Sequence, residues 1–119
     1  MSTPKDITFF HNPKCSTSRN AQTLLSGKSA SFDTVEYLKT PLTRDQVRSI
    51  LTYLDAETHP EVIKEFLRKD APEAKTIEEA QDILEQDPGM MQRPLVVDWR
   101  RKKAVIGRPA DAVLHIFKD

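Results

Sequence analysis

Four short runs of β-branched and aromatic residues constrain the fold of this chain more than any other feature of its sequence. Two lie near the N-terminus, ITFF at 7–10 and SFDTVEYL at 31–38, and two near the C-terminus, PLVVDW at 94–99 and KAVIG at 103–107. Runs of this length, bounded by turn-forming residues, are typical of strands. They predict a four-stranded sheet whose halves are separated by the whole middle of the chain.

The segments between these runs carry apolar residues at helical spacing. The first helix is expected from Ser16 to about Leu25, with Gly27 as its C-cap. Three helices are expected in the middle of the chain, and their start signals are Thr43 as an N-cap, Pro60 in a first turn, and Thr76 with Glu79 as a capping box. A last short helix, PADAVLHIF, also begins with proline.

The element order is therefore strand–helix–strand, a helical middle, and strand–strand–helix. The first unit requires a parallel crossover, whereas the basic turn RRKK joins the last two strands as a hairpin. This order predicts an α/β fold with a mixed four-stranded sheet and flanking helices. At 119 residues and 38% hydrophobic content, the chain is expected to form a single domain, 1–119, with a helical insertion over about 43–90.

Composition and charge exclude several classes of protein. The 18 basic and 18 acidic residues balance, so no nucleic-acid partner is expected. The N-terminal stretch MSTPKDITFF lacks the features of a signal peptide, and no apolar run approaches the roughly 20 residues of a membrane span. The polar helix faces offer no oligomer seam. We therefore expect a soluble, cytoplasmic monomer that does not associate with membranes.

The lone cysteine, Cys15, lies at the junction of the first strand and the first helix, within HNPKCSTSRN. A free cysteine often packs as a small hydrophobe, but here its neighbours are polar. A nucleophilic thiol needs its pKa lowered from about 8.5 by roughly two units, which is about 2.7 kcal/mol. A helix N-terminus supplies only about 0.3–2 kcal/mol. A further cation or donor is therefore required, and the local candidates are His11, Lys14 and Arg19.

The residue types around Cys15 narrow the chemistry further. Position 18 is serine, so the chain has no Cys-X-X-Cys pair and an oxidised Cys15 must be resolved by an external thiol. Backbone N–H groups at the helix start would also bind an oxyanion. His11, His59 and His115 are scattered without ligand spacing, so no metal site is expected.

Three motifs resemble one family in the same order along the chain. HNPKCSTSRN is similar to the active-site signature of the glutaredoxin-coupled arsenate reductases, the ArsC family. FLRKD resembles the family's central LLRK segment, and RPLVVDWRRKKAVIGRP resembles its C-terminal block. The resemblance extends from Ile7 to Phe117. It implies an ArsC-like, thioredoxin-like fold with a helical insertion.

The resemblance also implies roles for particular residues. Cys15 would be the catalytic cysteine, and His11 would help to lower its pKa. The three oxyanion-binding arginines would be Arg68, Arg93 and Arg108. Residues beside the thiolate that would bind the oxyanion are Ser16, Thr17, Ser18 and Arg19. Thioredoxin-like folds place a cis proline beside the active cysteine, and this position corresponds to Arg93–Pro94.

By the same resemblance, the reaction would reduce arsenate to arsenite. The Cys15 thiolate would form an adduct with arsenate, glutathione would attack it, and glutaredoxin would regenerate the thiol. No cofactor would be bound, and glutathione would be a co-substrate. Two departures from the family pattern stand out. Position 16 is serine where arsenate-specific members usually have glycine, and the segment after FLRKD is short.

Two other functions fit the same motifs. The first is a glutathione-dependent thiol oxidoreductase acting on another substrate, because Cys-Ser-Thr-Ser has the Cys-X-X-Ser pattern of monothiol glutaredoxins. The second is a non-catalytic regulatory protein like the Spx group, which resembles ArsC and binds RNA polymerase. Spx proteins usually carry Cys-X-X-Cys as a redox switch, and Ser18 in this chain makes such a switch unavailable.

Overall fold

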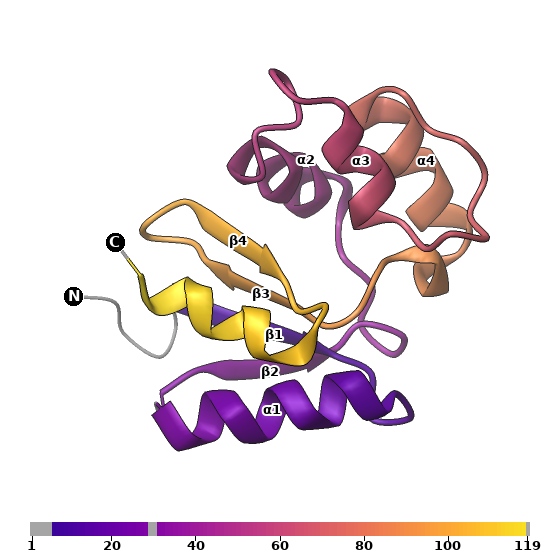
Figure 1. Cartoon of the computed structure of the whole chain (residues 1–119). Coiled ribbons are helices and arrows are strands. Elements are labelled where there is room, and N and C mark those ends of the chain that lie inside the picture. Colours follow the sequence, from indigo (N-terminus) through magenta and orange to yellow (C-terminus); the bar gives the residue numbers. More distant parts are fainter. Residues whose placement is uncertain (1–5, 29–30, 119) are drawn as a thin grey trace. The chain divides into compact units, whose positions relative to one another are not determined.

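The protein is described here by a computed structural model that covers residues 6–28 and 31–118. Within these residues the chain forms two compact units, and Figure 1 labels their elements. The sheet unit consists of the described residues up to Tyr37 and those from Arg93 onward, and the helical unit is Leu38–Gln92. The expected insertion over about 43–90 falls within the helical unit. No helix in the described ranges has the length and apolar character needed to span a bilayer.

The sheet unit contains one mixed sheet with the strand order β2–β1–β3–β4. The strands are β1 (Ile7–His11), β2 (Asp33–Glu36), β3 (Leu95–Asp98) and β4 (Lys103–Ile106). β1 pairs in parallel with β2 and antiparallel with β3, and β3 forms an antiparallel hairpin with β4. Helix α1 (Ser16–Lys28) makes the crossover between β1 and β2 (Figure 1). The expected parallel crossover, C-terminal hairpin and mixed four-stranded α/β sheet are confirmed.

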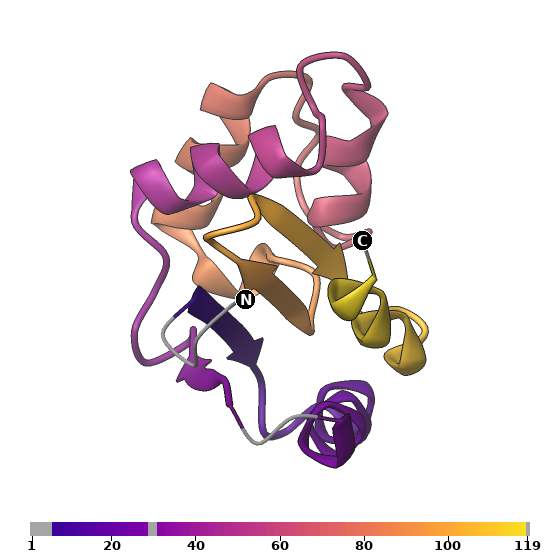
Figure 2. The same ribbon diagram turned by 90° about the vertical axis from the view of Figure 1, so that its left-hand side faces the viewer.

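Helices α1 and η3 (Ala110–Phe117) cover the same face of the sheet, as Figure 2 shows. Phe9 and Val96 are register partners on this face and begin its core. The helices complete that core with Ala21 and Leu25 from α1 and Val113 and Ile116 from η3. Side chains alternate along a strand, so His11, two residues after Phe9, also points toward α1. This alternation brings a histidine to the helix that follows Cys15.

Both helices of the sheet unit differ from the expected structure, α1 in where it ends and η3 in its helix type. α1 does not stop at Gly27 but continues to Lys28, because none of the described glycines adopts the positive φ that a glycine C-cap needs. The last helix begins after Pro109 as expected, but it is a 3₁₀ helix. Its final carbonyls are satisfied by side chains of the β3–β4 hairpin. Arg101 donates to Ile116 and Lys118, and Lys103 donates to His115 and Lys118.

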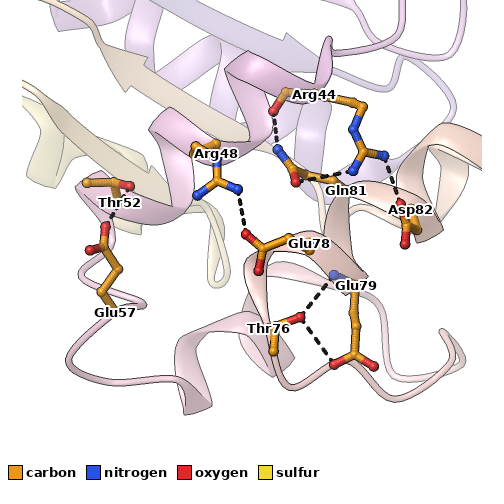
Figure 3. Close-up of polar contacts among 9 residues, drawn as sticks. All are labelled: Arg44, Arg48, Thr52, Glu57, Thr76, Glu78, Glu79, Gln81 and Asp82. Atoms are coloured by element: carbon orange, nitrogen blue, oxygen red, sulfur yellow. Dashed lines mark hydrogen bonds and ion pairs between the residues drawn. The ribbon is translucent and has the colours of Figure 1, made fainter.

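The helical unit contains α2 (Arg44–Tyr53), α3 (Glu61–Phe66), α4 (Ile77–Gln86) and the 3₁₀ turn η2 (Pro88–Met90). Ion pairs join α2 to α4: Arg44 lies 2.8 Å from Asp82, and Arg48 lies 2.5 Å from Glu78 (Figure 3). These side chains are largely exposed to solvent, so each pair contributes little to stability. The buried faces contribute more, and they comprise Val47, Ile50 and Leu51 of α2 with Ala80 and Leu84 of α4.

Of the three predicted start signals in this unit, Pro60 directly precedes α3, and the two N-cap threonines differ in how completely their capping boxes form. The Thr43 hydroxyl accepts the Gln46 N–H at 3.1 Å, and the Gln46 side chain accepts the Thr43 N–H at 2.9 Å. Thr43 is thus confirmed as an N-cap and forms a full capping box. The Thr76 hydroxyl accepts the Glu79 N–H (Figure 3), but the Glu79 carboxylate accepts the N–H of Lys75 instead of that of Thr76. The second box is therefore only half formed.

Helix α3 is shorter than its apolar pattern predicts. It ends at Phe66 because Leu67 becomes extended and forms a bridge with Met91. The Phe66 carbonyl accepts the Gln92 N–H at 2.8 Å, and the Arg68 N–H donates to the Met90 carbonyl at 2.8 Å. Strand-like pairing with the returning chain thus replaces the last turn of the helix.

Leu25 and Leu38 differ in how much of the side chain is exposed to solvent. Leu25 is fully buried in the sheet-unit core, whereas Leu38 is 50% exposed. Leu25→Ala should destabilise the protein by about 2–5 kcal/mol, because it removes buried methyl groups and leaves a cavity. Leu38→Ala should change stability by less than about 1 kcal/mol. Urea unfolding of both variants checks this, and equal losses would contradict the described core.

Candidate active site at Cys15

The turn between β1 and α1 is held by hydrogen bonds within the segment. The Asn12 side-chain oxygen accepts the Lys14 N–H at 3.0 Å, and the Asn12 carbonyl accepts the Cys15 N–H at 3.0 Å. The Arg19 guanidinium donates to the Pro13 carbonyl at 2.9 Å. The Cys15 carbonyl accepts the Arg19 N–H at 3.0 Å, which is the first bond of the helix. Cys15 is therefore the N-cap residue of α1.

The N-cap position determines what the thiol contacts. A side chain at this position folds back to accept from the second and third N–H groups of the helix. Thr17 and Ser18 occupy these two places, and their backbone N–H groups donate to the Cys15 sulfur. The helix dipole also favours negative charge here. The sulfur thus takes the place that a serine or aspartate oxygen fills at an ordinary helix start.

The cation at this thiol comes from far along the chain. The register of β1 with β3 places Leu95 opposite Phe10, so the residues before Leu95 lie beside those that follow Phe10. Arg93 is thereby brought to the Cys15 turn, and its guanidinium donates to the sulfur. The Arg93–Pro94 peptide bond is cis, which confirms the expectation, and Arg108–Pro109 is cis as well.

The Cys15 thiol has a lowered pKa. Burial of the sulfur acts in the opposite direction, since it favours the neutral thiol. The N–H of Ser18, the hydrogen bond from Arg93, the N–H of Thr17 and the positive charge of Arg93 outweigh it and hold the pKa below its ordinary value. The thiolate needed for nucleophilic chemistry is therefore stabilised by one guanidinium and two backbone donors.

One donor of Arg93 remains available. Its Nε atom is buried and has no hydrogen-bond partner among the residues that the structure describes. Leaving a buried donor unpaired costs about 1–3 kcal/mol, so such atoms are rare and gather where a ligand completes the bond. An acceptor that binds beside the Cys15 sulfur would satisfy it. The arrangement thus combines a stabilised thiolate with an unsatisfied donor on an arginine.

A buried pair of side chains, His11 and Ser18, supports the turn that carries Cys15. The Ser18 hydroxyl lies 2.7 Å from His11 Nδ1 and accepts the Asn12 N–H at 3.0 Å. Burial lowers the pKa of His11, an effect that Glu36 opposes and Arg19 reinforces. The imidazole is therefore neutral at pH 7, and it contacts Ser18 rather than contributing to the lowered pKa of Cys15.

The structure brings together only part of the residue set expected from sequence. Cys15, Thr17, Ser18 and Arg93 meet at the sulfur. Arg108 contacts Arg93 rather than the sulfur, because its guanidinium donates to the Arg93 carbonyl at 3.0 Å. Arg68 belongs to the helical unit, where its Nε lies 3.2 Å from an Asp70 carboxylate oxygen.

The four residues that follow Cys15 contribute in different ways. Thr17 and Ser18 act through their backbone N–H groups, and the Ser18 hydroxyl is already bonded to His11 and Asn12. Ser16 is exposed. Arg19 was a local candidate for the cation beside the thiol, but its guanidinium donates to the Pro13 carbonyl.

Sequence reasoning missed Gly107. Its N–H donates to the Pro94 carbonyl at 2.8 Å, and a Cβ added to it would lie 2.7 Å from Pro94 Cγ. Only a glycine permits this approach. The available signal was the glycine directly before Arg108–Pro109, in the motif GRP. Among the described residues, no three His, Cys, Asp or Glu side chains gather as metal ligands would.

The fold and the thiol site define an ArsC-like protein of the thioredoxin-like α/β class. The structure is similar to that of an arsenate reductase from Vibrio cholerae, with a TM-score of 0.78 over 93% of this chain and 97% of the other, at 22% identity. The chain belongs to the family described as "Protein of unknown function (DUF1687)", whose family model matches residues 1–107.

Proteins that are similar in sequence to this chain carry different functional names. The uncharacterized protein YfgD of Escherichia coli K12 is 34% identical over 94% of this chain and 97% of its own length. An arsenate reductase of the same strain is 28% identical over 96% of this chain and 82% of its own length. A global transcriptional regulator Spx of Streptococcus pyogenes is 27% identical over 80% of this chain and 74% of its own length. The chain is thus similar both to arsenate reductases and to a transcriptional regulator.

The lowered thiol pKa predicts a pH-dependent alkylation rate. Cys15 is the only cysteine, so the iodoacetamide rate reports it alone in the folded protein and in urea. The folded protein should give the lower midpoint, because Arg93 and the helix N–H groups stabilise the thiolate. A folded midpoint at or above the midpoint in urea would contradict the described site.

The same shift predicts how stability depends on pH. A thiol whose folded pKa lies below its unfolded pKa stabilises the folded state above the unfolded value, and this contribution disappears as pH falls through the folded pKa. The stability advantage of wild type over Cys15→Ser should therefore grow as pH rises through this interval. Urea unfolding of both proteins across pH 5–10, a range of about five units around the ordinary thiol pKa, checks the sign.

Removal of the Ser18 hydroxyl should destabilise the turn. In Ser18→Ala, the Asn12 N–H loses its acceptor and His11 loses its partner. The expected cost is about 1–3 kcal/mol in urea unfolding. Ser26→Ala is the matched control, because Ser26 is exposed in the same helix. Equal effects of the two substitutions would show that the buried hydroxyl contributes nothing.

Proposed function

We propose that this protein is an arsenate reductase, in which the Cys15 thiolate attacks arsenate and glutathione with glutaredoxin supplies the electrons. The observation that carries the proposal is the contact of the Arg93 guanidinium with the Cys15 sulfur, together with the unsatisfied Nε of Arg93. A disulfide substrate has no negative charge that would require such a donor. A tetrahedral oxyanion has both the charge and the acceptor oxygens.

Binding of arsenate beside a thiolate requires neutralisation of charge. Two anions repel each other, and a guanidinium placed between them reduces that repulsion while its planar fork matches the oxygens. Arg93 is suited to this role because one of its donors contacts the sulfur and another is free. The N-terminus of α1 supplies further positive potential at the same place. Sulfur and arsenic would thus be held together by the groups that stabilise the thiolate.

The proposed steps balance in atoms and electrons. The thiolate forms an S–As bond, and one arsenate oxygen leaves as water after taking up protons. The thiol of glutathione then attacks the Cys15 sulfur. The S–As bond breaks and its electron pair stays on arsenic, which changes from arsenic(V) to arsenic(III) and departs as arsenite. Cys15 and glutathione are left as a mixed disulfide, so two thiols have supplied the two electrons.

Return to the thiol requires a second external thiol. The chain has one cysteine, and the Cys-X-X-Cys partner position is the buried Ser18, so no internal thiol can displace glutathione. A glutaredoxin would take over the glutathione and release Cys15. A reducing, cytoplasmic compartment fits a protein that works through a free thiol.

The remaining residues of the expected set have proposed roles of their own. His11 would support the site through Ser18. Arg68 would bind the oxyanion, and Arg68→Gln tests this through the arsenate KM. Ser16 and Arg19 would line the anion site without holding the sulfur.

A regulatory role is the second candidate, because one relative is named a global transcriptional regulator. Such a protein would bind RNA polymerase, and co-purification with the polymerase would reveal it. A thiol oxidoreductase with another glutathione-dependent substrate would use the same Cys15 chemistry. The regulatory role does not account for the unsatisfied donor of Arg93, whereas a carboxylate of glutathione would be an acceptor for it in a thiol oxidoreductase.

The proposed activity predicts arsenate-dependent oxidation of NADPH. The assay contains the protein, arsenate, glutathione, glutaredoxin and glutathione reductase. Cys15→Ser should abolish turnover, because serine is not ionised near neutral pH and cannot form the disulfide. Arg93→Lys keeps the charge but loses the planar fork, so kcat/KM should fall by about 10- to 100-fold, a change that corresponds to about 1.4–2.7 kcal/mol.

The assay needs a control for the reductant and for folding. A glutaredoxin of verified activity on a standard mixed disulfide excludes failure of the coupling system. Arg100→Lys is the matched substitution, because Arg100 is an exposed arginine of the β3–β4 turn. Wild-type protein that gives no arsenate-dependent turnover under these conditions would rule out arsenate as the substrate.

A further inference from the structure

We propose that Arg108 is a positioning residue, which fixes the place where the Arg93 guanidinium meets the Cys15 sulfur by holding the Arg93 carbonyl. The resemblance to ArsC implies a different role, direct binding of the oxyanion. The inference concerns the free protein and can be tested without arsenate. Its link to catalysis rests on the proposed function, but its measurement does not.

Two consecutive residues hold two consecutive carbonyls. Arg108 Nη1 donates to the Arg93 carbonyl at 3.0 Å, and the Gly107 N–H donates to the Pro94 carbonyl at 2.8 Å. Gly107 and Arg108, which directly follow β4, thus bind the carbonyls of Arg93 and Pro94, which directly precede β3. We call these two hydrogen bonds the bracket. Two bonds on adjacent peptide groups restrict rotation of the backbone between them, which a single bond would not do.

This bracket is anchored in the core. A Cβ on Gly107 would lie 2.6 Å from Val113 Cγ1 and 2.7 Å from Pro94 Cγ. Gly107 is therefore packed between the proline ring and a fully buried valine of η3. Close packing of this kind leaves little room for displacement. The backbone at Arg93 is thus tied, through Gly107 and Val113, to the hydrophobic core of the sheet unit.

The Arg93 side chain depends on its backbone for its direction. No carboxylate lies within ion-pair distance of its guanidinium in the described ranges, and its Nε has no partner there. The contact recorded for the guanidinium is the Cys15 sulfur. An arginine side chain carries about 2 kcal/mol of rotamer entropy, so a guanidinium without side-chain partners is easily lost from one position. A fixed backbone at Arg93 reduces that loss.

The two possible roles of Arg108 give opposite results in the absence of oxyanion. Arg108 is not among the groups that directly lower the Cys15 pKa, so if it were only a direct ligand its removal would affect arsenate binding and leave the alkylation midpoint of the free protein nearly unchanged. A positioning residue would alter the Arg93–sulfur contact in the free protein. The decisive measurement is therefore the alkylation midpoint of Cys15, in buffer without phosphate, sulfate or arsenate.

The experiment compares four variants with wild type. Arg93→Ala sets the full effect of losing the guanidinium and should raise the midpoint. Arg108→Ala should raise it by at least half of that increase, and Arg108→Lys, which keeps a donor and the charge, should restore it in part. Lys14→Met removes an exposed positive charge one residue from Cys15 and should raise the midpoint less than Arg108→Ala does, so that loss of charge alone is excluded.

Gly107→Ala tests the other half of the bracket while leaving every charge in place. It should also raise the midpoint, because Pro94 must move to admit the added methyl group. Near-ultraviolet circular dichroism identifies any variant that has lost its fold. If Arg108→Ala is unfolded, the midpoints of Arg108→Lys and Gly107→Ala are compared with that of wild type instead.

Three outcomes would overturn the inference. A wild-type midpoint in Arg108→Ala, with an increased arsenate KM, would make Arg108 a direct ligand. A wild-type midpoint in Arg93→Ala would show that Arg93 does not stabilise the thiolate. A rise in Lys14→Met equal to that in Arg108→Ala would reduce the effect to net charge. If the proposed function fails, the arsenate assay is negative while the shifts in midpoint remain, so the two failures are distinguishable.

Discussion

The antiparallel pairing of β1 with β3 is the constraint on which the rest of the site depends. β1 delivers the turn that carries Cys15, and β3 begins directly after Arg93–Pro94. Their register places Leu95 opposite Phe10, so an arginine from late in the chain meets a cysteine from its beginning. The core between the sheet, α1 and η3 fixes this pairing. The chemistry at the sulfur is therefore set by strand register as much as by any local motif.

Much of the fold could be predicted because it follows from local patterns. Apolar runs mark the strands, the chain order requires the parallel crossover, and Thr43 with Gln46 forms its capping box from neighbouring residues alone. The differences arise where distant segments decide the outcome. Helix α3 ends early because Leu67 pairs with Met91, and the carbonyls at the end of η3 are taken by Arg101 and Lys103.

The site residues likewise fall into those that local sequence patterns indicate and those that distant segments supply. The energy argument from sequence showed that a helix N-terminus is insufficient for Cys15 and that a further cation is needed. The local candidates were His11, Lys14 and Arg19, but the described cation is Arg93, which only the family resemblance indicated. Proximity in sequence does not reveal that the Arg19 guanidinium braces the turn or that His11 is occupied by Ser18. Gly107 was missed because its importance lies in a close approach to Pro94.

The thiolate cap of α1 couples the redox state of the protein to its folding. In the reduced state, the Thr17 and Ser18 N–H groups have an anion to bind. The Cys15 sulfur of a mixed disulfide carries no charge, so these donors and the helix dipole lose that anion when the sulfur is oxidised. Folding therefore favours the reduced protein and makes Cys15 a good leaving group. The first turn of α1 thus lowers the free energy of the thiolate form relative to an oxidised Cys15, while an external thiol would still have to supply the electrons.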